Sequence, residues 1–193
     1  MPDLEKLKKL KEQRNYARLI DWANFNKNPA TSRAARDLIA QDPADLAEYL
    51  YETAEWTRKN SGHSGRRLPR RGVALLRQVT GMAVELGEPM LPPLVASLRA
   101  YPAYGDPDIK TRLLYFSLVF DVLTRIGNPA HDDLEALTKD KDPDISKLAK
   151  QALKDLPEDE DEDKGAKWDT WDDDDEDDED EEYDEDDEES DDD

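Results

Sequence analysis

The chain has 193 residues, no cysteine and a formal net charge of −22. The absence of cysteine excludes disulfides, thiolate metal sites and cysteine nucleophiles. Residues 157–193 hold 27 Asp and Glu against two Lys, whereas residues 1–156 hold 25 basic and 22 acidic residues, a net of +3. We therefore expect two parts: a slightly basic domain over residues 1–156 and a polyanionic tail over residues 157–193.

No stretch of the chain has the features of a targeting or membrane segment. The N-terminal "MPDLEKLKKLKEQRNYARL" is charged and lacks the apolar centre of a signal peptide. The longest apolar-rich run, Leu113–Leu123, is too short to span a bilayer and contains Ser117 and Asp121. We expect a soluble cytoplasmic protein without membrane contacts, acting as a monomer or in transient complexes.

One tripeptide recurs five times: Asn or Asp, then Pro, then Ala or Asp. An Asn or Asp side chain accepts hydrogen bonds from the free N–H groups of a helix's first turn, and Pro fits the first helical position. Pro also disfavours a helical conformation in the residue before it. Each copy therefore predicts the end of one helix and the start of the next. The copies are Asn28-Pro29-Ala30, Asp42-Pro43-Ala44, Asp106-Pro107-Asp108, Asn128-Pro129-Ala130 and Asp142-Pro143-Asp144.

Apolar residues recur with helical spacing along the domain, and no segment alternates as a strand does. An N-terminal helix over residues 3–12 comes first. The helix after Asp106 is apolar around most of its circumference, so we expect it to be the most buried, and Gly127 is placed to end it. The other predicted core stripes are Ala34, Ala35, Leu38 and Ile39; Leu46, Tyr49, Leu50, Thr53 and Trp56; Val73, Leu76, Val79, Thr80, Ala83 and Leu86; and Ile145, Leu148, Ala149, Ala152 and Leu153.

Two segments align in register around their prolines. The matched pairs are Ile20 with Leu134, Lys27 with Lys141, Ser32 with Ser146, Arg33 with Lys147, Ala35 with Ala149, Arg36 with Lys150, and Ile39 with Leu153. A third segment, residues 93–116, places Leu98 at the Ile20 position and Ile109 at the Ile145 position. Each unit is a helix, a short turn, and a second helix with basic and small residues. Since one pair cannot bury its apolar stripe alone, neighbouring pairs must stack.

These units resemble HEAT or HEAT-like repeats, the armadillo-type α-solenoid. The closest is "IGNPAHDDLEALTKDKDPDISKLAKQALKDL", with its Ile-Gly-Asn-Pro start, its Asp-Pro between the helices and its Ala-rich second helix. The resemblance is good over residues 15–40 and 88–156 and weaker over 41–86. It implies an all-α, right-handed solenoid of about four helix pairs plus the N-terminal helix, and a family that mostly supplies binding surfaces.

The domain has few residues in patterns that would support catalysis. His63 lies in a Gly/Ser-rich turn and His131 follows a helix start, and neither has metal ligands at the usual spacing. HEAT-like di-iron hydroxylases require several His-Glu pairs that this chain lacks. We find no phosphate-binding loop and no Ser-His-Asp grouping. We therefore expect exposed histidines, no metal, no cofactor and no catalytic residue.

A basic cluster precedes and begins the helix near Pro69. It comprises Arg66, Arg67, Arg70, Arg71 and Arg77. Arginine favours forked contacts with phosphate or carboxylate, and cations in a helix's first turn oppose the helix dipole. The cluster is either a solvated loop with snorkelling arginines or an anion-binding patch. The ligand of such a patch would be nucleic acid, an acidic partner or the chain's own tail.

The tail combines acid with aromatic residues. Asp172 to Glu182 form an unbroken acidic run, and Trp168, Trp171 and Tyr183 lie around it. This composition predicts disorder, because little apolar surface can offset chain entropy. Acidic tracts with embedded aromatics resemble the segments by which histone chaperones engage basic proteins. The alternative is a solubilising or weakly cation-binding tail.

These observations favour a non-catalytic protein-interaction module, a scaffold or adaptor whose acidic tail engages a basic protein or the arginine patch. A nucleic-acid-binding protein gated by the tail is the alternative. A third possibility is a HEAT-like alkylpurine DNA glycosylase, in which Trp22, Trp56 and several Asp would line a cleft.

Overall fold

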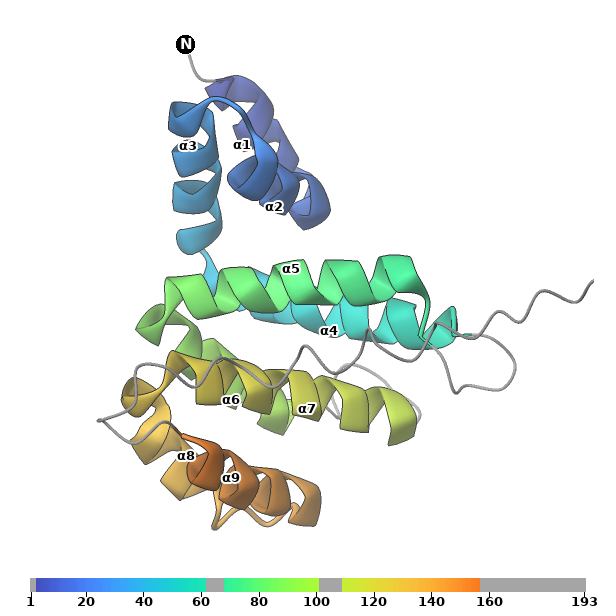
Figure 1. Cartoon of the computed structure of the whole chain (residues 1–193), viewed down its shortest axis with the longest axis vertical. Coiled ribbons are helices and arrows are strands. Elements are labelled where there is room, and N and C mark those ends of the chain that lie inside the picture. Colours follow the sequence, from blue (N-terminus) through green and yellow to red (C-terminus); the bar gives the residue numbers. More distant parts are fainter. Residues whose placement is uncertain (1–2, 62–67, 101–108, 157–193) are drawn as a thin grey trace, which may run out of the picture. The chain divides into compact units, whose positions relative to one another are not determined.

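A computed structural model describes residues 3–61, 68–100 and 109–156 of the chain (Figure 1). All regular structure in these residues is helical, which confirms the all-α prediction. The α-helices are α1 (Leu4–Glu12), α2 (Tyr16–Phe25), α3 (Pro29–Ala40), α4 (Pro43–Lys59), α5 (Arg70–Leu86), α6 (Leu91–Ala100), α7 (Ile109–Ile126), α8 (His131–Leu137) and α9 (Pro143–Asp155). Two short 3-10 turns, η1 (Glu88–Met90) and η3 (Asn128–Ala130), precede α6 and α8. Within the described ranges, no helix is both long and apolar enough to cross a membrane.

Two of the predicted helix starts have the expected hydrogen bonds. At α3, the side-chain oxygen of Asn28 accepts from the backbone N–H of Ala30 at 3.0 Å and of Thr31 at 3.4 Å. At α9, the Asp142 carboxylate accepts from Asp144 and Ile145 at the same two distances. The Asn or Asp side chain therefore satisfies N–H groups that an uncapped helix would leave open.

The turns before these two helices also correspond. Asn26 accepts a hydrogen bond from the N–H of Asn28 at 2.9 Å, and Asp140 accepts one from Asp142 at 3.0 Å. The matched serines both reach back to the preceding helix: the Ser32 hydroxyl donates to the Ala23 carbonyl. The Ser146 hydroxyl donates to the Thr138 carbonyl at 2.6 Å. The sequence match between these segments therefore extends to their polar contacts.

The other copies of the tripeptide behave differently. Asp42 occupies the residue before α4 without a side-chain capping bond, and its carboxylate lies 2.9 Å from Lys11 Nζ. Asn128 begins η3, and α8 starts three residues later at His131. Asp106-Pro107-Asp108 lies outside the described residues. The tripeptide marks a helix boundary in each described copy, but a neighbouring lysine or a 3-10 turn changes how Asp42 and Asn128 are used.

Glycine is required where α5 and α7 end. Gly87 and Gly127 have φ of 65° and 83° with ψ of −134° and −145°, a conformation that residues with a Cβ rarely adopt. Both N–H groups donate to the last turn of the preceding helix, and both carbonyls accept from a residue of the following 3-10 turn. The prediction that Gly127 ends its helix is confirmed.

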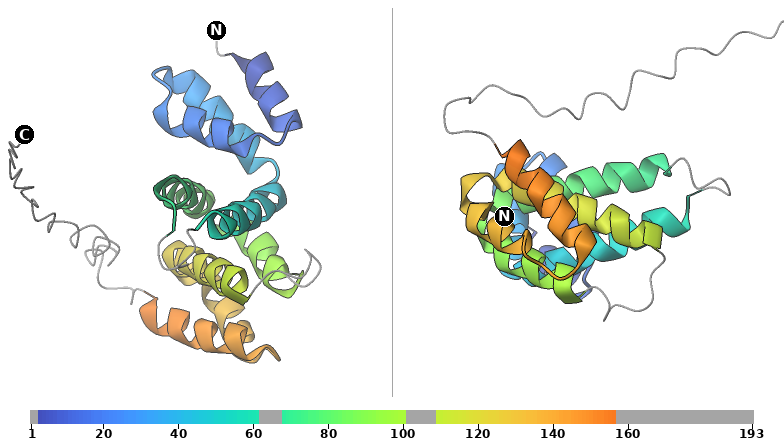
Figure 2. Two further views of the ribbon diagram at one scale, coloured as in Figure 1. Left: turned by 90° about the vertical axis from the view of Figure 1, so that its right-hand side faces the viewer. Right: turned by 90° about the horizontal axis from the view of Figure 1, so that it is seen from below.

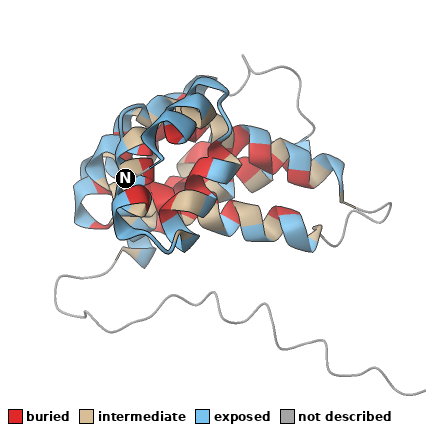
Figure 3. Ribbon diagram, turned by 90° about the horizontal axis from the view of Figure 1, so that it is seen from above, coloured by how far each residue is buried: buried red, intermediate tan, exposed pale blue. Residues whose placement is uncertain are grey.

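Buried apolar residues form one continuous core from Leu7 to Ala152, and Figure 3 colours the buried positions red on the ribbon. The predicted stripes are buried or half-buried with one exception, because Trp56 is 43 % exposed. α7 contributes Tyr115, Phe116, Val119 and four other buried residues. Ile109, in its first turn, is 65 % exposed, whereas Ile145, the residue aligned with it, is buried. In α7 the buried face begins at Thr111 instead.

The helices pack as successive neighbours. α2 contacts α3, α4 contacts α5, and α8 contacts α9, while α5 contacts α7 and α7 contacts α9 (Figures 1 and 2). Polar groups join some of these helices. The Tyr115 hydroxyl donates to Ser97 at 2.6 Å between α7 and α6, and Arg112 of α7 pairs with Asp142 and Asp144 at the start of α9.

α4 and α5 approach closely at Gly72. A Cβ at this position would lie 2.6 Å from both Cγ2 and Oγ1 of Thr57. Thr57 is fully buried, and its hydroxyl has no hydrogen-bond partner among the described residues. The contact therefore depends on glycine having no side chain.

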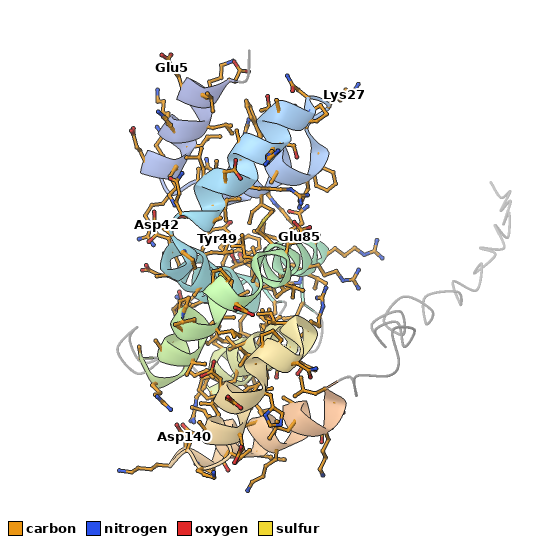
Figure 4. All side chains as sticks on the ribbon, turned by 90° about the vertical axis from the view of Figure 1, so that its left-hand side faces the viewer. Glu5, Lys27, Asp42, Tyr49, Glu85 and Asp140 are labelled. Atoms are coloured by element: carbon orange, nitrogen blue, oxygen red, sulfur yellow. The ribbon has the colours of Figure 1, made fainter. Side chains whose placement is uncertain are left out.

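Polar contacts connect Arg14, in the turn between α1 and α2, and Tyr16, the first residue of α2, with α4. Figure 4 labels Asp42, just before α4, and Tyr49, within it. The Tyr16 hydroxyl donates to Asp45 at 2.9 Å, and the Tyr16 and Tyr49 ring centroids lie 5.5 Å apart. Arg14 donates to Glu48 at 2.6 Å, and this hydrogen bond raises the pKa of Arg14. Burial, together with the hydrogen bond to Asp45, raises the pKa of Tyr16 above its ordinary value, and burial also raises the pKa of Tyr49.

Candidate interaction surface

The structure describes three of the five arginines of the predicted basic patch. Arg70, Arg71 and Arg77 are exposed on α5, and Arg66 and Arg67 lie outside the described residues. Arg70 and Arg77 are two helical turns apart on the same side of α5, and Arg71 is turned from Arg70 by about 100° around the helix. The side chains of Arg71 and Arg77 form no hydrogen bond or ion pair within the described ranges. They are therefore available to an external anion.

The predicted tail and its aromatic residues Trp168, Trp171 and Tyr183 lie outside the described residues.

Basic and acidic residues are distributed unequally between alternate helices of the domain. In the contacting neighbours α2 and α3, α4 and α5, α6 and α7, and α8 and α9, the later helices α3, α5, α7 and α9 hold eleven Lys and Arg against five Asp and Glu. We call these the second helices. Their predecessors α2, α4, α6 and α8 hold four Lys and Arg against eight Asp and Glu. The domain's small net charge of +3 therefore conceals a basic set and an acidic set of helices.

Contacts join the second helices to one another. Arg36 of α3 pairs with Glu85 of α5 at 2.7 Å, α5 packs on α7, and α7 packs on α9. Glu85 is labelled in Figure 4. Some cations on these helices serve the fold, as Arg36 and Arg112 do.

The most regular set of available cations is on α9. Lys147, Lys150 and Lys154 are exposed at positions i, i+3 and i+7, opposite the buried face formed by Ile145, Ala149 and Ala152. None of the three makes an ion pair or hydrogen bond in the described part of the chain. We call these residues the lysine row.

Of the residues considered for catalysis, the structure describes His131, Trp22 and Trp56. His131 is exposed beside Asp132, with Nδ1 3.4 Å from the carboxylate. His63 lies outside the described residues. Trp22 is half-buried against the core, and Trp56 is exposed near the end of α4. Across residues 3–61, 68–100 and 109–156, no group of His, Asp and Glu has the arrangement of a metal site.

Comparisons of the chain with protein-family models, curated proteins and solved structures gave no match.

Sequence reasoning concentrated on the arginine cluster and overlooked the lysine row as a surface. The sequence does indicate basic positions here, because Arg33 and Arg36 align with Lys147 and Lys150. The packing adds what the pattern lacked: Arg36 is engaged by Glu85, whereas Lys150 is unpaired within the described residues.

Proposed function

We propose that the chain is a non-catalytic protein-interaction module, a scaffold or adaptor built from HEAT-like helix pairs, whose acidic segment, residues 157–193, binds basic proteins. The observation that carries this proposal is the partition of charge. A segment with 27 acidic residues and two lysines follows a domain with a net charge of +3. Such a density of like charge attracts basic surfaces over a distance set by ionic strength.

The repeat interpretation is supported by the polar contacts that α3 and α9 share. Their capping oxygens, preceding Asx turns and back-bonding serines occupy matched positions 114 residues apart in the sequence. Stacked helix pairs of this kind expose extended surfaces, which suits a binding role.

Aromatic residues would give the acidic segment more than charge. Trp168, Trp171 and Tyr183 can pack on aliphatic stems or on arginine side chains of a basic partner, adding contacts that do not depend on salt. A purely solubilising tail would gain nothing from them.

Purified core histones and poly-lysine provide a test of the acidic segment. We expect the full chain to bind both with strong salt dependence, and residues 1–156 to bind neither. Replacing Trp168, Trp171 and Tyr183 with Ala should weaken histone binding several-fold, about 1 kcal/mol, while poly-lysine binding changes little. Histone binding by residues 1–156 equal to that of the full chain would refute the acidic segment as ligand.

A second function, nucleic-acid binding by the domain, is favoured by the excess of cations on the second helices. It requires a specific surface, for which the lysine row is our candidate.

A further inference from the structure

The lysine row is an exposed line of positive charge that the described domain does not neutralise. Lys147 and Lys154 lie about 10 Å apart along the α9 axis, since each residue advances about 1.5 Å. The acidic residues nearest to them in α9 are occupied. Asp144 pairs with Arg112 at 3.2 Å, and Asp155 accepts from Gln151 Nε2 at 2.9 Å.

Of the three acidic residues of the neighbouring helix α8, Glu135 and Asp132 have partners, and Asp133 has none among the described residues. Glu135 pairs with Lys139 at 3.0 Å, and Asp132 lies beside His131. Lys141, in the turn before α9, is another exposed lysine without an ion pair among the described residues. The row therefore keeps its three positive charges available to solvent.

We propose that the lysine row is a docking surface for the phosphate backbone of a nucleic acid. A duplex strand carries one phosphate per about 3.4 Å of helix axis, so about 10 Å of α9 faces about three phosphates of one strand. Separate ammonium groups suit a ligand with regularly spaced charges, whereas a single small phosphate is better held by forked arginines or converging N–H groups.

The ligand's length and stiffness favour nucleic acid over an acidic polypeptide. Arg33, Arg71 and Arg77 are further exposed cations without partners among the described residues, and a long polyanion has the length to contact more than one helix. A duplex presents its charges already ordered, while a flexible acidic peptide must lose conformational entropy to do so.

The acidic segment would oppose this docking through charge. Its net charge of −25 repels phosphate at low ionic strength, so residues 1–156 should bind nucleic acid more tightly than the full chain. A basic protein that neutralises the segment would then raise the affinity for nucleic acid. This last coupling rests on the proposed function, whereas binding by residues 1–156 does not.

The experiment measures fluorescence anisotropy of a labelled DNA duplex of about 20 base pairs at several salt concentrations. It uses the full chain, the full chain with Asp172–Glu182 changed to Asn and Gln, and residues 1–156, which retain every buried residue of the described core. We expect affinity to rise in that order. In residues 1–156, Lys147→Gln/Lys150→Gln/Lys154→Gln should weaken binding at least about tenfold and lower the slope of log K against log salt by about 3.

The matched control is Lys6→Gln/Lys8→Gln/Lys9→Gln, which removes the same charge from exposed positions of α1. It should change the salt slope by less than about 1. The proposal is wrong if residues 1–156 do not bind DNA at low salt, or if the α1 control weakens binding as much as the α9 variant. It is also wrong if poly-glutamate binds the row more tightly than DNA, which would indicate an acidic protein partner. None of these results would contradict histone binding by the acidic segment.

Discussion

Gly72 is the residue at which the contact between α4 and α5 is most sensitive to a single methyl group. Gly72→Ala would bring Cβ to 2.6 Å from Thr57, too close for either atom to remain in place. We expect a loss of about 1–3 kcal/mol in the free energy of unfolding, because a packed core resists an added group. Urea denaturation followed by circular dichroism measures it.

A double variant separates this clash from the general cost of changing glycine. Thr57→Ala removes the two nearest atoms, Cγ2 and Oγ1, and leaves only its Cβ at 3.0 Å, so Gly72→Ala in that background should cost less. Equal costs in the two backgrounds would show that the contact with Thr57 is not the cause.

Tyr16 gives the stability a dependence on alkaline pH. Its pKa is raised in the folded state by burial and by the hydrogen bond to Asp45, so the folded protein keeps the phenolic proton more tightly than the unfolded chain. The stabilisation is complete below about pH 10, where unfolded tyrosine is protonated, and is lost as the pH rises further. In Tyr16→Phe, the urea midpoint should fall less steeply as the pH rises. The remaining fall should come from Tyr49, whose pKa is also raised by burial. An unchanged slope in Tyr16→Phe would contradict this account.

At the scale of the helix, local sequence predicts boundaries better than it predicts the use of each side chain. Asn28 and Asp142 have the capping bonds that their position before Pro indicates. Asp42 has the same local sequence, but Lys11, from another helix, engages its carboxylate. Residue spacing cannot predict that Lys11 is the partner of Asp42, because the pairing depends on which helices pack together.

The two capped helices allow a paired prediction. Asn28→Ala should cost about 1 kcal/mol, the usual value of a side-chain cap. Asp142→Ala should cost more, because Asp142 also pairs with the half-buried Arg112. Asn28→Asp keeps an accepting oxygen and should be nearly neutral. Thermal and urea unfolding measure all three, and a larger loss at Asn28 than at Asp142 would contradict the assignment.

At the scale of the whole molecule, the spacing of apolar residues predicted the helical class, and composition predicted the separation of charge. It could not show which cations are available. Arg36 is paired with Glu85, 49 residues away, while Lys147, Lys150 and Lys154 are unpaired among the described residues. Similarly, Trp56 fits its helical stripe yet is exposed, and Ile109 fits its repeat register yet faces solvent. Burial at these positions depends on where the next helix lies.

Removal of residues 157–193 tests whether the core depends on them. Since the buried residues of the described core lie between Leu7 and Ala152, we expect the melting temperature at high salt to change by less than about 3 °C, or about 1 kcal/mol. High salt suppresses the charge repulsion that the deletion also removes. A larger fall would show that the acidic segment stabilises the fold.

Ion pairs between the N-terminal helices α1–α3 and the helices α4–α5 should make the local unfolding of α1–α3 sensitive to ionic strength. Lys11 with Asp42, Arg14 with Glu48, and Arg36 with Glu85 all link α1–α3 to α4–α5. Salt screens such pairs without weakening apolar packing. Amide hydrogens of α1–α3 should therefore exchange through openings that become easier as salt rises, whereas those in the middle of α5 and α7 should exchange only on global unfolding.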